Sequence, residues 1–308
     1  MACVALASAA HAQTWPGPTS PSPETQAAML KAGAGDPAPL VALASSGNAE
    51  AQYYAGVMYI FGRGTIAKDT PRGCAYELSA SASRADAMHL VGLCYQNGGI
   101  GGAPDRTKAE AAFTRAAALG FPKSKCALGQ MLMTDPQEAK RGLGLCKEGA
   151  SAGDADAQVA VGAAYFAGGA ATGQDRREAR KWYAMAAQQN DPEAARRLGE
   201  MYAQGDGGKR DPKKAMELWV AAEKAGDPLV AILVADTLFA DMTGGRTPSP
   251  GKYTFRGGFP LDQIDATEEW YRQALNSDPR PDVKKRADYA IKVLDEFKTA
   301  AKSAPARR

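Results

Sequence analysis

A glycine or alanine recurs along this chain about every 36 residues. The successive spacings are 36, 37, 33, 37 and 36 residues, and the six positions are Gly56, Gly92, Gly129, Gly162, Gly199 and Ala235. A period of this size is typical of helical repeat arrays, in which each unit packs only against its neighbours. We therefore expect an all-α protein whose stacked units present a long concave surface.

Four of the periods carry the pattern of a helical hairpin. The first helix, which we call helix A, contains Ala-x-x-x-x-Gly-x-x-Tyr, and this spacing places a tyrosine and two small residues on one face. A glycine-rich turn follows, and then helix B with an aromatic pair such as Trp182-Tyr183. The small residues allow two helix backbones to approach, and the aromatic side chains fill the space between the helices.

Asp-Pro dipeptides mark the predicted helix starts. Aspartate caps the free N–H groups of a helix, and proline at the first helical position loses no hydrogen bond. These dipeptides occur at 36/37, 135/136, 191/192, 211/212, 227/228 and 278/279.

The whole pattern resembles the Sel-one-like repeat (SLR), a relative of the tetratricopeptide repeat. Units 154–190 and 191–226 match it best, and units 48–84 and 85–120 match with substitutions. Unit 121–153 has lost its glycine turn and aromatic pair, and the sixth unit has Ala235 in the glycine position. The resemblance covers 47–276 and implies a right-handed α/α superhelical solenoid of about six repeats, with the A helices lining its concave face.

Four cysteines are separated by 20 residues within each successive pair, Cys74 and Cys94, then Cys126 and Cys146. If 70–83 and 85–97 are antiparallel helices, Cys74 lies opposite Cys94. The second pair is about one helical turn out of register. Two interpretations stay open for both pairs, a disulfide or two small buried side chains. Cysteines that link a helix B to the next helix A occur in the SLR family, which favours Cys74–Cys94.

The beginning of the sequence predicts export. We expect 1–12 to be the end of a signal peptide whose start is missing, because Ala10-His11-Ala12 before Gln13 suits signal peptidase. The alternative is an alanine-rich disordered start. Residues 13–22 form a Pro-rich tether. The prediction for the protein is therefore periplasmic or secreted.

Helical caps are expected on both sides of the repeats. They are an N-terminal cap over 23–46 and a C-terminal capping helix over 277–302, followed by a disordered tail over 303–308. The last repeat also contains a long insertion, 241–262, which is either a functional loop or a turn that tolerates extra length.

Composition and motifs exclude several classes of function. The net charge is +3 with opposite charges nearly balanced, so we expect no nucleic-acid partner. No apolar run reaches the roughly 20 residues of a membrane helix. One histidine, His89, follows the expected cleavage site, and we predict it to be a partly exposed helix residue. The sequence therefore predicts no catalytic residues, no metal site and no cofactor.

The candidate partner-binding residues lie on the predicted concave face and in the insertion. Positions two before and one or five after the repeated glycine should point away from the packed face. The set comprises Tyr54, Val57, Phe61, Leu90, Arg197, Glu200 and Gln204, together with Tyr253 and Phe255 of the insertion. Exposed aromatic groups can be binding hot spots, but the leading half-repeat could equally bury those near the N-terminus.

The sequence features suggest three candidate functions. The first is an exported scaffold that binds a protein partner in its concave groove, which by the resemblance would be an envelope-assembly or signalling protein. The second is a peptidoglycan- or carbohydrate-binding envelope protein that uses the insertion. The third is a β-lactamase-like envelope hydrolase, which the lack of a nucleophile with a base argues against.

Overall fold

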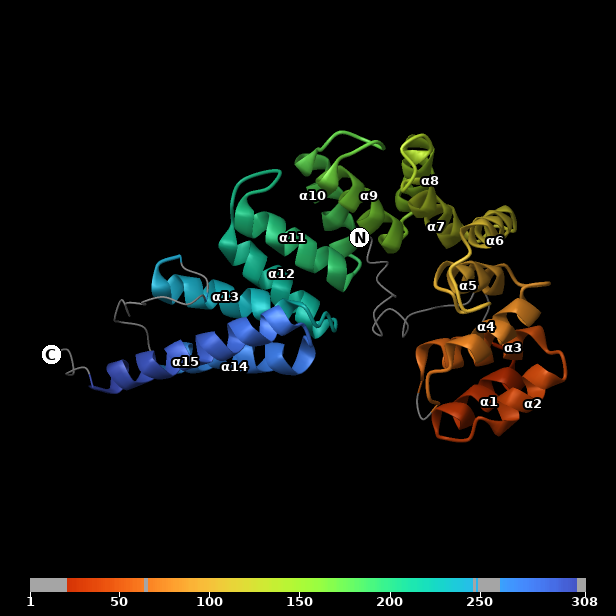
Figure 1. The fold of residues 1–308 in the computed structure, drawn as a ribbon, viewed down its shortest axis with the longest axis horizontal. Helices are drawn as coiled ribbons and strands as arrows, with labels where there is room; N and C mark the ends of the chain where they lie inside the picture. The colour runs from red at the N-terminus through yellow and green to blue at the C-terminus, as the bar shows by residue number, and fades with distance from the viewer. Residues whose placement is uncertain (1–20, 64–65, 246–247, 249–260, 304–308) are drawn as a thin grey trace. The chain divides into compact units, whose positions relative to one another are not determined.

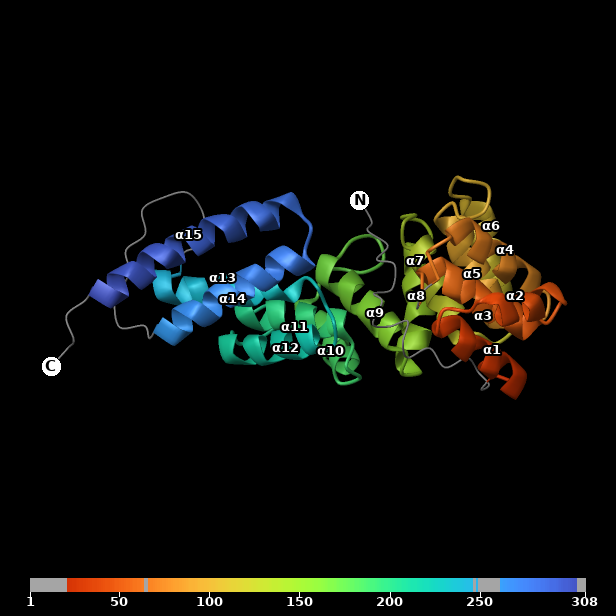
Figure 2. The ribbon, with the colours of Figure 1, turned by 90° about the horizontal axis from the view of Figure 1, so that it is seen from below.

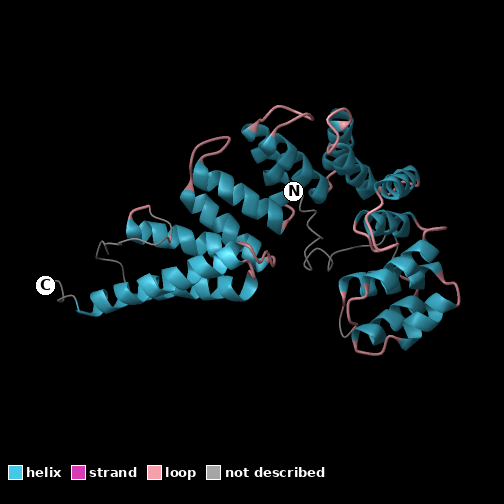
Figure 3. Ribbon diagram, in the orientation of Figure 1, coloured by secondary structure: helices cyan, strands magenta, loops and turns pink. Residues whose placement is uncertain are grey.

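The computed structural model describes residues 21–63, 66–245, 248 and 261–303, and within these ranges the chain forms helices and turns without a strand (Figure 3). The helices are α1 (Pro23–Gly33), α2 (Ala38–Ser45), α3 (Ala49–Phe61), α4 (Thr70–Ala80), α5 (Ala85–Gln96), α6 (Arg106–Ala118), α7 (Pro122–Leu132), α8 (Ala139–Ser151), α9 (Ala155–Ala167), α10 (Arg176–Ala187), α11 (Pro192–Gln204), α12 (Pro212–Lys224), α13 (Val230–Thr243), α14 (Leu261–Ser277) and α15 (Pro281–Ser303). Their succession is visible in Figure 1. The helices fall into two compact units, and the division lies after Trp182 within α10.

The N-terminal unit consists of successive helical hairpins. Helix α3 packs on α4, α5 on α6, and α7 on α8, while α1 and α2 precede the first hairpin and α2 packs on α3. These pairs are the expected A and B helices of three repeats. The all-α repeat fold predicted from the periodicity is therefore confirmed.

A main-chain hydrogen bond closes the turn of four hairpins at the same place. The N–H of the aspartate that caps helix B donates to the carbonyl oxygen of the repeated tyrosine, over 2.8 to 2.9 Å. The pairs are Asp69 to Tyr59, Asp105 to Tyr95, Asp175 to Tyr165 and Asp211 to Tyr202. The tyrosine and the aspartate are ten residues apart in the first three pairs and nine apart in the fourth, so the same hydrogen bond closes four turns of nearly equal length.

The prediction that each Asp-Pro dipeptide starts a helix, with aspartate as the cap and proline as the first helical residue, holds at two of the six positions. At Asp191 and Asp211 the carboxylate accepts the N–H three residues on, and proline is the first helical residue. The other four dipeptides precede their helices by one to three residues. Asp227, for example, accepts the N–H of Leu229 and starts a turn before α13.

Two disulfides cross-link the N-terminal unit. Cys74 on α4 is bonded to Cys94 on α5, with 5.9 Å between the Cα atoms. Cys126 on α7 is bonded to Cys146 on α8, with 4.0 Å between the Cα atoms. The second pair was expected to be out of register, but Gly129 and Gly142 face each other across α7 and α8 and allow a very close approach. Both cysteine pairs therefore form disulfides.

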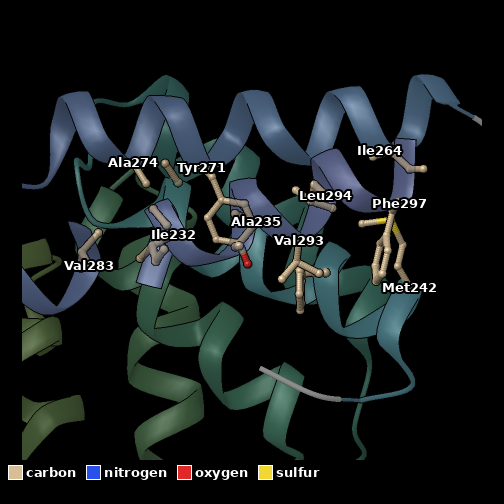
Figure 4. Close-up of a cluster of buried hydrophobic side chains, with 14 residues drawn as sticks. Ile232, Ala235, Met242, Ile264, Tyr271, Ala274, Val283, Val293, Leu294 and Phe297 are labelled. Atoms are coloured by element: carbon tan, nitrogen blue, oxygen red, sulfur yellow. The ribbon is translucent and has the colours of Figure 1, made fainter. Parts of the chain in front are cut away.

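The C-terminal unit contains the hairpin of α11 and α12, then α13, α14 and α15. Helices α14 and α15 lie side by side (Figures 1 and 2) and enclose a hydrophobic cluster with α13 (Figure 4). In this cluster Tyr271 packs edge-on against Phe239, and its hydroxyl donates to Asp236 over 2.9 Å. Val283, Leu294 and Phe297 form the buried stripe of α15. The final helix thus covers the apolar face of the last repeat.

Candidate interaction surface

The predicted contact residues of the N-terminal unit fall into one apolar group and one separate residue. Tyr54 and Val57 on α3 are half-buried and pack against a buried cluster that contains Tyr53 and Leu90. Phe61, also half-buried, packs instead against Ile60 and the Cys74–Cys94 disulfide. The exposed parts of Tyr54 and Val57 are therefore the accessible apolar surface of this group.

Leu90 does not lie on that surface. Its side chain is 5% exposed, because it packs into the cluster of Tyr53, Ala80 and Ala87. The prediction that Leu90 points away from the packed face is therefore wrong, since α5 contributes this position to the contact between successive repeats. Leu90 belongs instead to the buried cluster against which Tyr54 and Val57 pack.

The predicted contact residues of the C-terminal unit form a charged row on α11. Arg197 is exposed and lies within 3.7 Å of Glu193 and 3.5 Å of Glu200, and Gln204 follows one turn later. Exposed ion pairs of this kind contribute little to stability. The row is therefore available for polar contacts at little cost to the fold.

A buried arginine next to this charged row, Arg196, holds one of its residues in place. Arg196 donates to Asp227 at the start of the next repeat over 2.8 Å and to Glu200 over 3.1 Å. Burial disfavours the charge of Arg196, but Asp227 and Glu200 outweigh it, and the pKa of the guanidinium is raised. Glu200 is thus held in place by a side chain that sequence analysis did not select.

Tyr253 and Phe255 lie outside the described residues, as do 1–20 and most of 241–262. The predictions for these segments remain predictions.

A buried polar cluster next to Tyr54 was not predicted from the sequence. Arg84 contacts both oxygens of Asp86 over 3.0 and 2.6 Å and lies 4.6 Å from the centre of the Tyr53 ring. Glu77 on α4 is completely buried, and within the described part of the chain neither of its carboxylate oxygens has a hydrogen-bond partner. Burial raises the pKa of Glu77 well above its usual range, and Asp86 raises it further.

His89 is buried, contrary to the prediction of a partly exposed residue. Its ring lies between those of Phe113 and Phe121, at 5.3 and 5.1 Å, and Nδ1 is 3.0 Å from the Ser124 hydroxyl. Burial, with a smaller contribution from the positive charge of Lys123, lowers the pKa of His89 to about 3. The imidazole is therefore a neutral core group and is not presented to a substrate.

The described helices show neither a membrane span nor a metal-binding cluster. Within these ranges, none of the helices combines the length and apolar character that a membrane crossing requires. The same part of the chain contains no cluster of three or more histidine, cysteine, aspartate or glutamate side chains that could hold a metal ion.

Comparison with protein families places the chain among helical repeat proteins. The Sel1 repeat model matches residues 49–84, 85–121, 155–191 and 192–227. These four matches coincide with the four units in which the tyrosine carbonyl accepts the N–H of the capping aspartate. No curated protein sequence matches the chain.

Solved structures with the same fold extend the similarity beyond the matched repeats. The crystal structure of c5321, described as a protective antigen of uropathogenic Escherichia coli displaying an SLR fold, is 25% identical with a TM-score of 0.58 over 86% of this chain and 53% of its own. This chain therefore spans about half the length of that protein. A Sel1 repeat protein from Oxalobacter formigenes is 20% identical with a TM-score of 0.58, over 85% of this chain and 100% of its own. The immunity protein Pa5087 from Pseudomonas aeruginosa is 19% identical with a TM-score of 0.50, over 75% and 83%.

Proposed function

Because this chain is a Sel1-like repeat protein, we propose that it is an exported, non-catalytic scaffold that binds a protein partner through the outward residues of its A helices. Proteins of this family are typically scaffolds for protein–protein interactions. The proposed partner is an envelope protein with a role in assembly or signalling. Because a fold does not by itself specify a binding partner, the proposal is based on the residues exposed on the A helices.

The observation that supports binding is the half-exposed pair Tyr54 and Val57 on α3. An aromatic ring that packs against buried residues on one face and is exposed to solvent on the other is already ordered. It therefore loses little conformational entropy when a partner covers it. Tyr53 and Leu90 are among these buried residues. Arg197, Glu200 and Gln204 are the corresponding polar positions of the C-terminal unit, and they suit the hydrogen-bonded rim of an interface.

The two disulfides support export. Structural disulfides persist in oxidising compartments and are rare in the cytosol of most organisms. Both disulfides here are buried between helices, where they cross-link the fold. We therefore propose a location in the periplasm or outside the cell. Mass spectrometry of the protein isolated from its native cell without reductant should show a mass lower by four hydrogens than that of the reduced protein. Free thiols at these four cysteines would contradict this location.

Site-specific crosslinking in the native cell tests the binding surface. A photoreactive phenylalanine analogue at Tyr54 should give a covalent adduct with the partner, identified by mass spectrometry, and the same analogue at Arg197 tests the surface of the C-terminal unit separately. The matched controls are Leu78 on α4 and Thr114 on α6, which are exposed on B helices. Purified partner should then bind the Tyr54→Ala variant at least tenfold more weakly than the wild type. Equal crosslinking at the control positions, or unchanged affinity of the variant, would overturn the proposal.

A further inference from the structure

The first repeat differs from its neighbours where helices A and B touch. In the second repeat the Phe113 ring lies against Gly92, and in the 192–227 repeat the Trp219 ring lies against Gly199. In the first repeat the corresponding residue is Glu77, whose carboxyl group lies against Gly56, with its Cδ 2.7 Å from where a Cβ would stand. A carboxyl group thus occupies the place of an aromatic ring.

No hydrogen bond at this position offsets the free-energy cost of burying the carboxyl group. Trp219, the equivalent polar aromatic, donates its indole N–H to the carbonyl of Arg196 over 3.1 Å. Glu77 is 0% exposed, and neither of its oxygens is hydrogen-bonded within the described residues. A buried carboxylate without a partner is very unfavourable, so the group takes the neutral form in the closed hairpin.

The ionisable groups around Glu77 do not provide a counter-ion. Tyr53 faces it from α3, while Arg84 and Asp86 face it from the start of α5. Arg84 is the single cation of this set, and both oxygens of Asp86 already engage it. The remaining influence of Asp86 opposes a second negative charge.

We propose that Glu77 makes the first repeat a proton-sensitive switch, in which α3 and α4 pack closely while Glu77 is protonated and separate locally when it loses its proton. The physical cause is linkage. In the open hairpin Glu77 meets water and titrates near its ordinary value of 4.5, whereas in the closed hairpin it retains the proton to a much higher pH. Between these two values opening releases a proton, so the opening constant rises by up to about tenfold per pH unit.

Hydrogen exchange measured from pH 5 to pH 9 tests the switch in the full-length protein. Peptides from α3 and α4 of the wild type should lose protection relative to Glu77→Gln as the pH rises, with a ratio that grows by up to about tenfold per pH unit. Peptides from α11 and α12 should behave alike in both proteins. The control Glu110→Gln, which makes the same change on α6, should follow the wild type. An α3–α4 ratio that stays constant over this range would overturn the proposal.

A second variant keeps the test decisive if Gln is poorly accommodated. Glu77→Phe restores the side chain that the next repeat uses, and it should make α3–α4 protection independent of pH and higher than in the wild type. The protonated carboxyl can also be detected directly. Infrared spectra of ¹³C-glutamate-labelled protein at pH 7 should contain a protonated acid C=O band that Glu77→Gln lacks, and its absence from the wild type would contradict the proposed neutral state.

Discussion

Gly129 and Gly142 show how single residues set the distance between two helices. A Cβ at either position would overlap the carbonyl oxygen of the other, so both must be glycine for α7 and α8 to touch. In the 192–227 repeat the glycine of helix A, Gly199, faces the Trp219 ring of helix B instead. A glycine of helix A thus lies at the contact in both hairpins, while the group of helix B that faces it differs.

Glycine-to-alanine substitutions at different positions of this hairpin should have opposite effects on stability. Gly129→Ala and Gly142→Ala should each destabilise the N-terminal unit by about 1–3 kcal/mol, because the backbone on the other side cannot move aside. Gly144→Ala on α8 has nothing within 4 Å of its new Cβ, and it should stabilise the unit by about 0.5–1 kcal/mol. Urea unfolding measures all three, and equal effects at Gly129 and Gly144 would contradict the contact.

His89 should make the protein sensitive to acid. Its pKa is lowered to about 3 in the folded protein, while the unfolded chain binds the proton near 6.5. Stability from this group is therefore complete above pH 6.5 and decreases as the pH falls toward 3, by up to about 1.4 kcal/mol per pH unit. Urea unfolding at pH 7 and pH 5 should show a larger loss for the wild type than for His89→Gln. A parallel loss in both proteins would show that His89 is not buried in its neutral form.

At the scale of helices, two kinds of cross-link hold the N-terminal unit. The Cys74–Cys94 disulfide joins helix B of one repeat to helix A of the next, whereas Cys126–Cys146 joins the two helices of a single hairpin. The second cross-link lies in the unit that lacks the aromatic pair. There a disulfide and two glycines replace the large side chain that fills the space in other repeats.

Removing either disulfide should cost about 3 kcal/mol, since each closes a loop of 20 residues. The variants Cys74→Ala with Cys94→Ala, and Cys126→Ala with Cys146→Ala, test them separately by urea unfolding. We expect the second pair of substitutions to cost at least as much, because its hairpin has no aromatic ring between the helices. A cost near zero for that pair would mean that the two glycines alone maintain the contact.

At the scale of the whole molecule, the chain consists of two compact units with different means of stabilisation. All four cysteines that follow Cys3 lie in the first unit, whereas the second relies on ion pairs such as Arg196–Asp227 and on the cluster beneath α15. In repeat proteins stability is approximately a sum of local and neighbour terms. Reduction of the disulfides should therefore affect the first unit more than the second.

Reduction of the native protein should separate these responses. Peptides from α4 to α8 should lose hydrogen-exchange protection after denaturant-assisted reduction and refolding without oxidant, while peptides from α11 to α15 should keep theirs. The oxidised protein taken through the same cycle is the control. Equal loss of protection in both units would show that the fold is lost as one cooperative whole.

The sequence by itself determined the repeat, its helical hairpins and the helix caps at Asp191 and Asp211. These features depend on residues close together in the chain, where helical periodicity fixes which side chains share a face. The tertiary structure decided what neighbouring repeats bury. Leu90, His89 and Glu77 differ little from exposed positions when each helix is considered alone, and only the packing of the next helix shows that they are buried. The binding surface was therefore predicted as a row of helix positions, whereas the side chains that support it required the contacts between repeats.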